Sequence, residues 1–494
     1  MAKQAASQQQ AAEAQATERT LLDQIVEEGR LGKDAETRQR GKDMVKEFVS
    51  QFLEGSMTLS RDSEAMINAR IAQIDHLISL QLNEVMHHPA FQKLEASWRG
   101  LKYLVSRTET SENLKIKVFN SSKKELLRDL QRASDFDQSA MFKKVYEEEF
   151  GVFGGHPFGA IIGDYEFGKG PEDLEMLEKV SQVAAAAHAP FISAVNHEMF
   201  NIETYTELGA PRDLAKVFDT TEYAKWKGFR NSDDARYVAL TMPHILMRDP
   251  YGKATRPVDE FDYEENVDGT EHNKYLWGNA AWALGARITD SYARYNWCAS
   301  IRGVEGGGKV EGLTVHNFTT DDGDVAMKCP TEVTITDRRE KELADLGFVP
   351  LVHCKNTDYA AFFSVQSCQK AKSYDTDAAN ANARLSTNLS YILAVSRFGH
   401  YLKAMMRDKI GSYMNRTECE NYLNRWIMGY TIDTNSASAE MKARHPLAEA
   451  RVDVTEVAGK PGCYRAVAFL KPHFQLDELT VSMRLVADLP QPAG

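Results

Sequence analysis

Cysteine is scarce in this chain and follows no recognisable spacing. The six cysteines form no CxxC pair and no pattern typical of a disulfide framework or a zinc site. We therefore expect reduced thiols and no bound metal. The six are Cys298, Cys329, Cys354, Cys368, Cys419 and Cys463.

Long apolar runs are also lacking. The first 18 residues, rich in Ala and Gln, contain no apolar stretch of a signal peptide, and no later segment approaches the length of a membrane-spanning helix. Positive charge is in deficit: the formal net charge is −12, and an acidic surface repels nucleic acid and anionic lipid. These absences predict a cytoplasmic protein with no nucleic-acid partner and no direct membrane insertion.

Complete catalytic motifs are absent as well. GVEGGGKV at 303–310 has the glycine and lysine spacing of a phosphate-binding loop, but Val310 stands where Ser or Thr must hold magnesium, and an extended segment follows. His197-Glu198 begins a zinc-protease motif whose second histidine is replaced by Asn201. For His87-His88 before Pro89, we expect a role at a helix end.

A cysteine nucleophile is the remaining enzymatic alternative. Cys329 and the adjacent pair His353-Cys354 bring thiol and imidazole groups close in sequence, although adjacency does not establish catalytic geometry. A cytosolic hydrolase using Cys354 or His353 is therefore kept as a rival hypothesis. The favoured interpretation is a protein with no catalytic residue.

What the chain does contain is enough apolar sequence for a folded protein of several domains. It has 494 residues, of which 43% are hydrophobic. After a tail of about 18 residues, apolar residues at helical spacing dominate the first 110 positions. The helical stripes are Leu21, Leu22, Ile25 and Val26, then Met44, Phe48 and Phe52, then Ile67, Ile71, Ile74, Ile78, Leu82 and Val85.

The middle of the chain mixes helix and strand. Residues 114–120 alternate like a strand, residues 158–167 have the pattern of a buried strand, and residues 171–188 that of a helix. Glycine-rich loops and short strands are expected over 290–330. A helix with a glycine stop is expected over 337–347.

The last part of the chain again changes character. We place a linker at 371–383, because it is polar and built of small residues, and a helix at 389–413. Alternating apolar residues around GKPG (459–462) predict a hairpin. Strands near a chain end can leave an open edge, which invites pairing with another chain, but packing within the chain is equally compatible with this pattern. The stripe at Leu21–Val26 is equally open between packing on the body and insertion into a partner's groove.

Long blocks of the sequence resemble the TssC/VipB family, the large subunit of the bacterial type VI secretion sheath. The resemblance runs from about residue 60 to 488. The blocks that carry it are 87–105, 142–167, 189–194, 301–313, 329–351, 354–367, 396–413 and 445–486.

The resemblance implies a structural protein that acts by polymerising and contracting. Its expected partners are a small sheath subunit of the TssB/VipA type, further sheath protomers in a helical polymer, the inner tube of Hcp hexamers, the baseplate, and the AAA+ ATPase ClpV. No cofactor is implied. The expected location is the bacterial cytoplasm, in a sheath anchored to the envelope through the baseplate.

The resemblance also implies roles for three groups of residues. Leu21, Leu22, Ile25 and Val26 would bind ClpV, within a recognised segment of about residues 17–30. Asp337, Arg338, Arg339, Glu340 and Lys341 would contact the inner tube. The strands shared between protomers would include Val452, Val454, Tyr464, Val467, Leu479, Val481, Met483 and Leu485.

The expected fold is therefore α+β or mixed α/β with several domains. Residues 1–60 would form a mobile tail and N-terminal helices, residues 61–372 a mixed α/β middle domain, and residues 373–494 a C-terminal domain with antiparallel strands shared between protomers. A third alternative, an adaptor for the ATPase that forms no tubes, shares the N-terminal helix but not the shared strands.

Overall fold

The computed structural model describes residues 35–53, 63–210, 212–259, 261–320, 322–433, 437–459, 462–473 and 475. The chain divides into two compact units, Met1–Ser79 and Leu80–Gly494. The helix predicted around Leu21–Val26 and the strand predicted from Leu479 lie outside the described residues.

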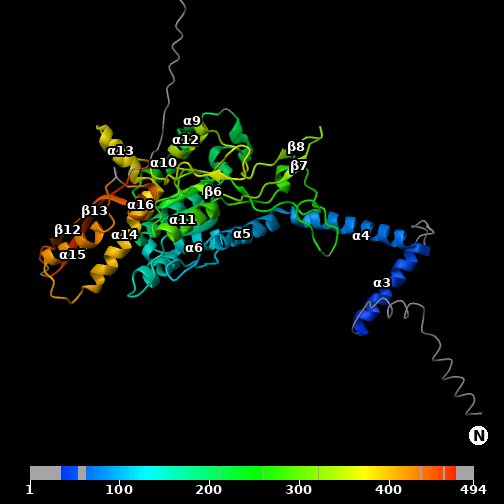
Figure 1. Cartoon of the computed structure of the whole chain (residues 1–494), viewed down its shortest axis with the longest axis horizontal. Coiled ribbons are helices and arrows are strands. Elements are labelled where there is room, and N and C mark those ends of the chain that lie inside the picture. The colour runs from blue at the N-terminus through cyan, green and yellow to red at the C-terminus, as the bar shows by residue number, and fades with distance from the viewer. Residues whose placement is uncertain are drawn as a thin grey trace, which may run out of the picture. The chain divides into compact units, whose positions relative to one another are not determined.

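The described part of the first unit is helical. α3 spans Ala35–Leu53, and α4 spans Ser63–Met86 and continues into the second unit (Figure 1). Four isoleucines recur along α4 at spacings of four, three and four residues, so they share one face. All four are exposed: Ile67, Ile71, Ile74 and Ile78. The predicted helical stripe is confirmed, and such spacing is typical of a face that packs on another helix.

The second unit is built on a four-stranded parallel sheet with the strand order β1-β2-β3-β9. Its strands are β1 (Ile161–Phe167), β2 (Phe191–Val195), β3 (Val238–Met242) and β9 (Val349–Pro350). Every residue of β2 and β3 is buried, as expected for parallel strands covered on both faces. The strand predicted within 158–167 is confirmed as β1, but it is less buried than predicted, because only Gly163 and Phe167 of the strand are buried.

Two helices cover the two faces of this sheet. In β3, Val238 and Leu240 pack in the cluster that contains α8 (Pro171–Ala187), whereas Ala239 packs in the cluster that contains α11 (Ala281–Tyr295). This alternation follows from the two-residue period of a strand. The helix predicted over 171–188 is confirmed as α8.

Short helices fill the connections around the sheet. Before β1 lie α5 (Pro89–Ser106), α6 (Lys123–Arg132), η1 (Phe136–Gln138), α7 (Ala140–Phe142) and the π-helix η2 (Lys143–Phe150). Between β2 and β3 lie η3 (His197–Phe200), η4 (Tyr205–Gly209), α9 (Leu214–Phe218), η5 (Thr221–Tyr223), α10 (Ala224–Asn231) and η6 (Asp234–Tyr237). Between β3 and β9 lie η7 (His272–Lys274) and α12 (Asp337–Asp345) besides α11.

Small sheets surround this framework. They are β10-β11-β6, made of Val352–His353, Ala360–Ala361 and Lys309–Val310; β4-β5, made of Ile245–Leu246 and Trp277–Gly278; and β7-β8, made of Asn317–Thr319 and Val325–Met327. β6 follows directly after the glycine run, so the extended segment predicted there is confirmed. The glycine run packs tightly: a Cβ on Gly308 would lie 2.6 Å from the carbonyl oxygen of Phe362.

A partly buried ionic cluster lies where β1 and β3 end. His244 Nδ1 is 2.5 Å from Glu332 Oε2, and His244 Nε2 is 3.0 Å from Glu166 Oε1. Burial lowers the pKa of His244, but the hydrogen bonds that its ring donates to Glu166 and Glu332 outweigh burial and raise the pKa to about 10. Burial likewise opposes the charge on Glu332, and its histidine partners nevertheless lower its pKa to about 2. An imidazolium therefore bridges two carboxylates here.

A second buried network holds the segment after β4 against α5. The Arg248 guanidinium makes two bonds of 2.6 and 3.0 Å to the Glu265 carboxylate, and its Nε lies 2.8 Å from Glu95 Oε1. His87 Nε2 is 3.2 Å from the same Glu265. Because the paired charges are buried and bidentate, they fix the relative position of these segments.

Among the described residues after 372, the C-terminal part contains four helices and a two-stranded hairpin. The helices are α13 (Asp377–Ser386), α14 (Leu389–Asp408), α15 (Arg416–Met428) and α16 (Ala439–Arg444), and the strands are β12 (Leu447–Glu456) and β13 (Tyr464–Pro472). Their core includes Trp297, which stacks on Phe398 of α14 with ring centroids 4.2 Å apart.

α14 joins this part to the sheet framework. Arg407 donates to the carbonyl oxygens of Phe150 and Val152, both at 2.8 Å, at the end of η2. His400 donates through Nε2 to the carbonyl oxygen of Ala187, at the end of α8. α14 is thereby bonded to two elements that precede it by more than 200 residues.

One local prediction was wrong, and another holds only in part. Residues 114–120 form no strand: the segment is irregular, Val118 and Phe119 are exposed, and no described strand pairs with it. Alternation alone does not make a strand where no neighbour supplies backbone partners. The segment 371–383 is not wholly a linker, because α13 begins at Asp377 with a hydrogen bond from Ala379 N to Thr376 Oγ1.

Gly100 should tolerate no side chain. A Cβ at this position of α5 would lie 2.2 Å from Nε1 of Trp282, whose indole is held by Asp164 Oδ1 at 3.2 Å. We expect Gly100→Ala to lower the free energy of unfolding in urea by about 1–3 kcal/mol, because the indole must move. The control is Gly228→Ala in α10, where no atom lies within 4 Å. It should stabilise by up to about 1 kcal/mol. Equal effects of the two variants would contradict this packing.

His400 should make stability depend on pH. Burial, supported by the charges of Arg397, His188 and Lys403, lowers its pKa from the ordinary 6.5 to about 4. Between these values the unfolded chain binds a proton at this position and the folded chain does not, so stability falls as the pH drops. Between pH 7 and 5 we expect the wild type to lose about 2 kcal/mol more than His400→Gln in urea unfolding. Identical losses in the two proteins would refute this assignment, and the exposed His76→Gln is the matched control.

Candidate assembly interface

The hairpin β12-β13 is the strongest candidate for contact with other chains. Its strands pair antiparallel from Glu456 opposite Tyr464 to Leu447 opposite Pro472. Gly459 and Gly462, in the connection, both have positive φ, at 77° and 79°. Glycine adopts this conformation without strain, so the hairpin predicted around 459–462 is confirmed.

One face of the hairpin packs on α15. Val452 and Val454 of β12 are fully buried against a core that includes Leu423 and Ile427 of α15, and Tyr464, Ala468 and Leu470 of β13 pack at its margin. The helix lies alongside β12 (Figure 1). This face therefore belongs to the chain's own core.

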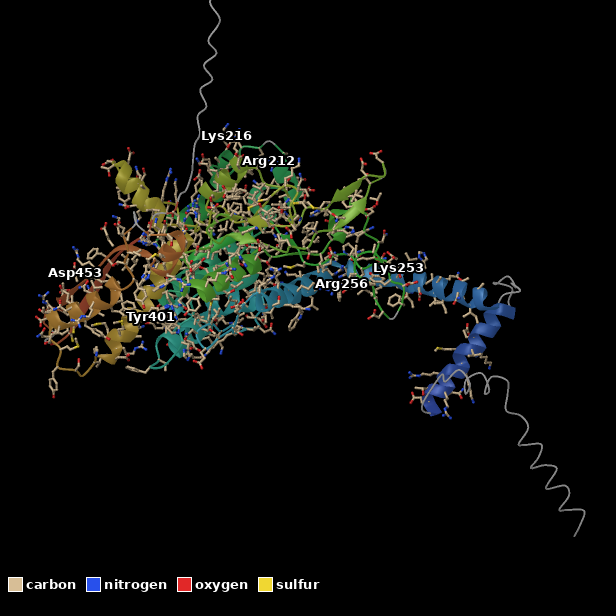
Figure 2. All side chains as sticks on the ribbon, in the orientation of Figure 1. Arg212, Lys216, Lys253, Arg256, Tyr401 and Asp453 are labelled. Atoms are coloured by element: carbon tan, nitrogen blue, oxygen red, sulfur yellow. The ribbon has the colours of Figure 1, made fainter. Side chains whose placement is uncertain are left out.

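The other face is open. Val467 and Phe469 are 43% and 52% exposed, and the guanidinium of Arg451 lies 4.8 Å from the centre of the Phe469 ring. Arg451 also pairs with Asp453, labelled in Figure 2, at 3.0 Å. A mixed apolar and charged sheet face that no described residue covers is a natural contact surface.

The two edges of the hairpin differ. Along β12, the outward N–H and C=O of Val452 are both bonded by the side-chain amide of Asn424, at 2.9 and 2.7 Å. The carbonyl oxygen of Val454 accepts from Arg416 at 3.1 Å, and its N–H donates to Glu420 at 3.4 Å. Side chains of α15 thus close this edge at Val452 and Val454.

Along β13 the outward backbone groups have no partner among the described residues. The N–H and C=O groups of Val452 and Val454 point away from β13. The pairs that exchange hydrogen bonds across the hairpin are therefore those of the odd-numbered residues, such as Asp453 with Val467. By the same alternation, the N–H and C=O groups of Ala466, Ala468 and Leu470 point outward. β13 thus presents an edge to which a further strand can be added.

The residues predicted to lie in shared strands therefore divide into four groups. Val452 and Val454 are buried in the chain's own core, Tyr464 is partly buried, and Val467 is exposed on the open face. The other four lie outside the described residues: Leu479, Val481, Met483 and Leu485.

The charged helix predicted to contact the inner tube is α12. Glu340 is buried, and burial raises its pKa. Arg339 is engaged within the chain through bonds to Glu342 and to the carbonyl oxygen of Arg212, a residue labelled in Figure 2. The three members with exposed side chains are Asp337, Arg338 and Lys341. The four anchors predicted for ClpV, namely Leu21, Leu22, Ile25 and Val26, lie outside the described residues.

The thiol and imidazole groups considered for catalysis are arranged differently from their order in sequence. His353 bonds Cys329 rather than its neighbour Cys354, and this bond raises the pKa of the imidazole. Burial raises the pKa of the Cys329 thiol, but the hydrogen bonds from His353 and Thr331 outweigh it and leave that pKa below its ordinary value. His353 is itself buried, with Nε2 2.7 Å from the carbonyl oxygen of Thr357. His88, as predicted, caps a helix: its Nδ1 accepts from Ala90 N at the start of α5.

Within the described ranges, no cluster of three or more His, Cys, Asp or Glu side chains is arranged to hold a metal ion. No described helix combines the length and the apolar character needed to cross a bilayer.

Sequence reasoning missed the residues that close the β12 edge. Arg416, Glu420 and Asn424 are polar residues at four-residue spacing on a helix, which is ordinary for a solvated face. Their partners are backbone atoms about 30 residues further on, and no local pattern announces such contacts. The capping box of α15, in which Asn415 and Glu418 bond each other's backbone, is the part of this helix that local sequence does indicate.

Two family models match the chain and define its class. The model described as EvpB/VC_A0108, tail sheath N-terminal domain, matches residues 68–369, and the tail sheath gpW/gp25-like domain of the same description matches residues 378–489. The chain is thus a tail sheath protein. Because these models cover well over half of its length, it belongs to the TssC/VipB family of type VI secretion sheath proteins, as the resemblance in sequence indicated.

A curated relative agrees with this assignment. The chain is 49% identical over 461 residues to the type VI secretion system sheath protein TssC1 of Pseudomonas aeruginosa, covering 93% of each chain. Among solved structures, it is similar to a chain of the anti-feeding prophage baseplate (TM-score 0.35, 9% identity) and to a chain of the contracted sheath of that prophage (TM-score 0.28, 12% identity). These matches cover 64% and 63% of this chain and 66%, slightly under two thirds, of each prophage chain.

The two faces of the hairpin should respond differently to truncation. Val454 is 1% exposed, so Val454→Ala should cost about 2 kcal/mol or more in urea unfolding, because it removes buried methyl groups. Val467→Ala, on the open face of the same hairpin, should cost less than about 1 kcal/mol. A larger loss at Val467 than at Val454 in the isolated chain would contradict the assignment of the two faces.

Proposed function

We propose that this chain is the large subunit of a type VI secretion contractile sheath. It forms a heterodimer with a small subunit of the TssB/VipA type, polymerises around the Hcp inner tube, and contracts to drive tube, spike and effectors outward. Its membership of the family, with 49% identity to a sheath protein over 93% of both chains, carries this proposal. The function is mechanical, and no catalytic residue is assigned.

The hairpin supplies a physical means of assembly. A strand from a neighbouring protomer or from the small subunit pairs with the outward backbone groups of β13, and the C-terminal segment from Leu479 supplies a strand in turn. Such contacts run head to tail, and head-to-tail contacts that do not close produce a helical filament. The open edge of β13, next to a closed edge on β12, supports this arrangement.

Shared strands also suit contraction. A backbone ladder resists separation along many bonds at once, while the attached bodies rotate as rigid units into a second lattice. The bonds of Arg407 and His400 to η2 and α8 make the hairpin-bearing part move with the sheet framework.

The other partners follow from the family. We propose that the inner tube contacts α12 through its exposed side chains, which are those of Asp337, Arg338 and Lys341, whereas Glu340 is buried. ClpV is proposed to grip residues 17–30 through Leu21, Leu22, Ile25 and Val26 after contraction. The sheath is proposed to stand in the bacterial cytoplasm, anchored to the envelope through the baseplate.

Blocking the outward N–H of one residue in β13 tests the proposal. Ala468→Pro removes an N–H that points away from β12, so the hairpin should keep its own ladder while the added strand loses a bond and meets the proline ring. Co-expressed with the small subunit, this variant should form at least about tenfold fewer tubes in negative-stain electron microscopy.

The matched control is Ala468→Ser, which keeps the N–H and should form tubes like the wild type. Circular dichroism and thermal unfolding of both variants establish that the fold is kept. If Ala468→Pro formed as many tubes as the wild type, β13 would not be the strand that pairs with a neighbouring chain. If the wild type formed no tubes with its partner, the proposed function would be wrong.

A further inference from the structure

The side-chain amide of Asn424 imitates a neighbouring strand. In an antiparallel ladder, a bonded pair of residues exchanges two hydrogen bonds, one from each N–H to the opposite C=O. Asn424 makes the same exchange with Val452, through Oδ1 at 2.9 Å and Nδ2 at 2.7 Å. One side chain thus satisfies the two groups that a residue of an added strand would satisfy.

The spacing of α15 repeats this arrangement along the edge. Arg416, Glu420 and Asn424 follow each other at four-residue intervals, a rise of about 6 Å along a helix. Outward-facing residues of a strand follow at two-residue intervals, or about 6.8 Å. The two repeats nearly match, and α15 and β12 run in opposite directions. Side chains that follow each other along this row of the helix therefore bond first Val454 and then Val452.

The start of β12 is closed as well, by backbone groups. Leu447 donates to the carbonyl oxygen of Tyr430 at 3.3 Å and accepts from Ile432 N at 3.1 Å, immediately after α15. The segment after α15 therefore bonds the outward backbone groups at the start of β12, as side chains of α15 do further along the strand.

We propose that Arg416, Glu420 and Asn424 form an edge guard, which reserves the hairpin's strand addition for β13. This inference rests on the proposed function, because it presupposes that the hairpin accepts a strand. It assigns to α15 a role in the specificity of assembly, because each hairpin then accepts strands only at the β13 edge and in one order.

The physical reason for a guard is that a two-stranded hairpin has two edges. Each presents the same kind of unpaired backbone, and an unprotected edge pairs with any available strand. Addition at β12 would place the incoming chain on the opposite side of the hairpin and direct the next subunit along a different path. A contractile lattice requires every subunit to repeat the same contact.

The experiment compares Asn424→Leu with Asn421→Leu, both co-expressed with the small subunit. Leucine has a similar size but no hydrogen-bonding group, so Asn424→Leu leaves the N–H and C=O of Val452 unpaired, whereas Asn421 is exposed on the same helix. We expect Asn424→Leu to form about fivefold fewer tubes and to yield sedimentable aggregates that bind thioflavin T, because an unpaired strand edge promotes pairing. Asn421→Leu should match the wild type in both measurements.

A milder variant covers the case in which Asn424→Leu does not fold. Arg416→Met removes the bond to the Val454 carbonyl oxygen from a side chain that is half exposed, and should reduce tubes about twofold with the same aggregates. Wild-type tubes without aggregates from either folded variant would overturn the edge guard and leave the proposed function intact. Failure of the wild type to form tubes would instead overturn the proposed function.

Discussion

Pairing of backbone groups along strand edges is the constraint that shapes both halves of this molecule. In the sheet framework, β2, β3 and β9 are fully buried, and α8 and α11 cover the two faces that such strands require. In the C-terminal part, two strands have one face in the core, one open face and two edges that need partners. Side chains of α15 bond the outward backbone groups of Val452 and Val454 in β12, whereas the outward groups of β13 have no partner among the described residues. Because the two edges differ in this way, the two sides of the hairpin are not equivalent for strand addition, which its residue pattern alone does not reveal.

The connection between these halves determines how force on the hairpin reaches the rest of the subunit. Beyond β13 the chain is held where Gln475 donates to Tyr391 on α14 and to the carbonyl oxygen of Ala299. α14 is in turn bonded to the ends of η2 and α8. Load applied to the strands would therefore pass through hydrogen bonds and stacked aromatic rings into the parallel sheet. Such a chain of contacts suits a subunit that moves as a rigid body between two lattices.

Local sequence predicted the elements whose cause is local. Periodicity and turn chemistry account for the stripe of α4, the strand β1, α8 with Pro171 at its first turn and the hairpin around Gly459. Residues 114–120 show the limit, because a strand depends on a neighbour that alternation cannot reveal. In the same way, α12 was recognised as a charged helix, but the burial of Glu340 follows from its packing in three dimensions. The closure of β12 by Asn424 is wholly a tertiary feature, and long blocks of family sequence, rather than any single motif, indicated the function.

A reconstruction by electron cryo-microscopy of tubes from the co-expressed subunits tests the central claim most directly, because it shows which edge of the hairpin carries an added strand. The account predicts a strand from another chain beside Ala466, Ala468 and Leu470, with Asn424 still bonded to Val452. A strand added beyond Val452, or a β13 edge with no strand beside it in the assembled tube, would contradict it.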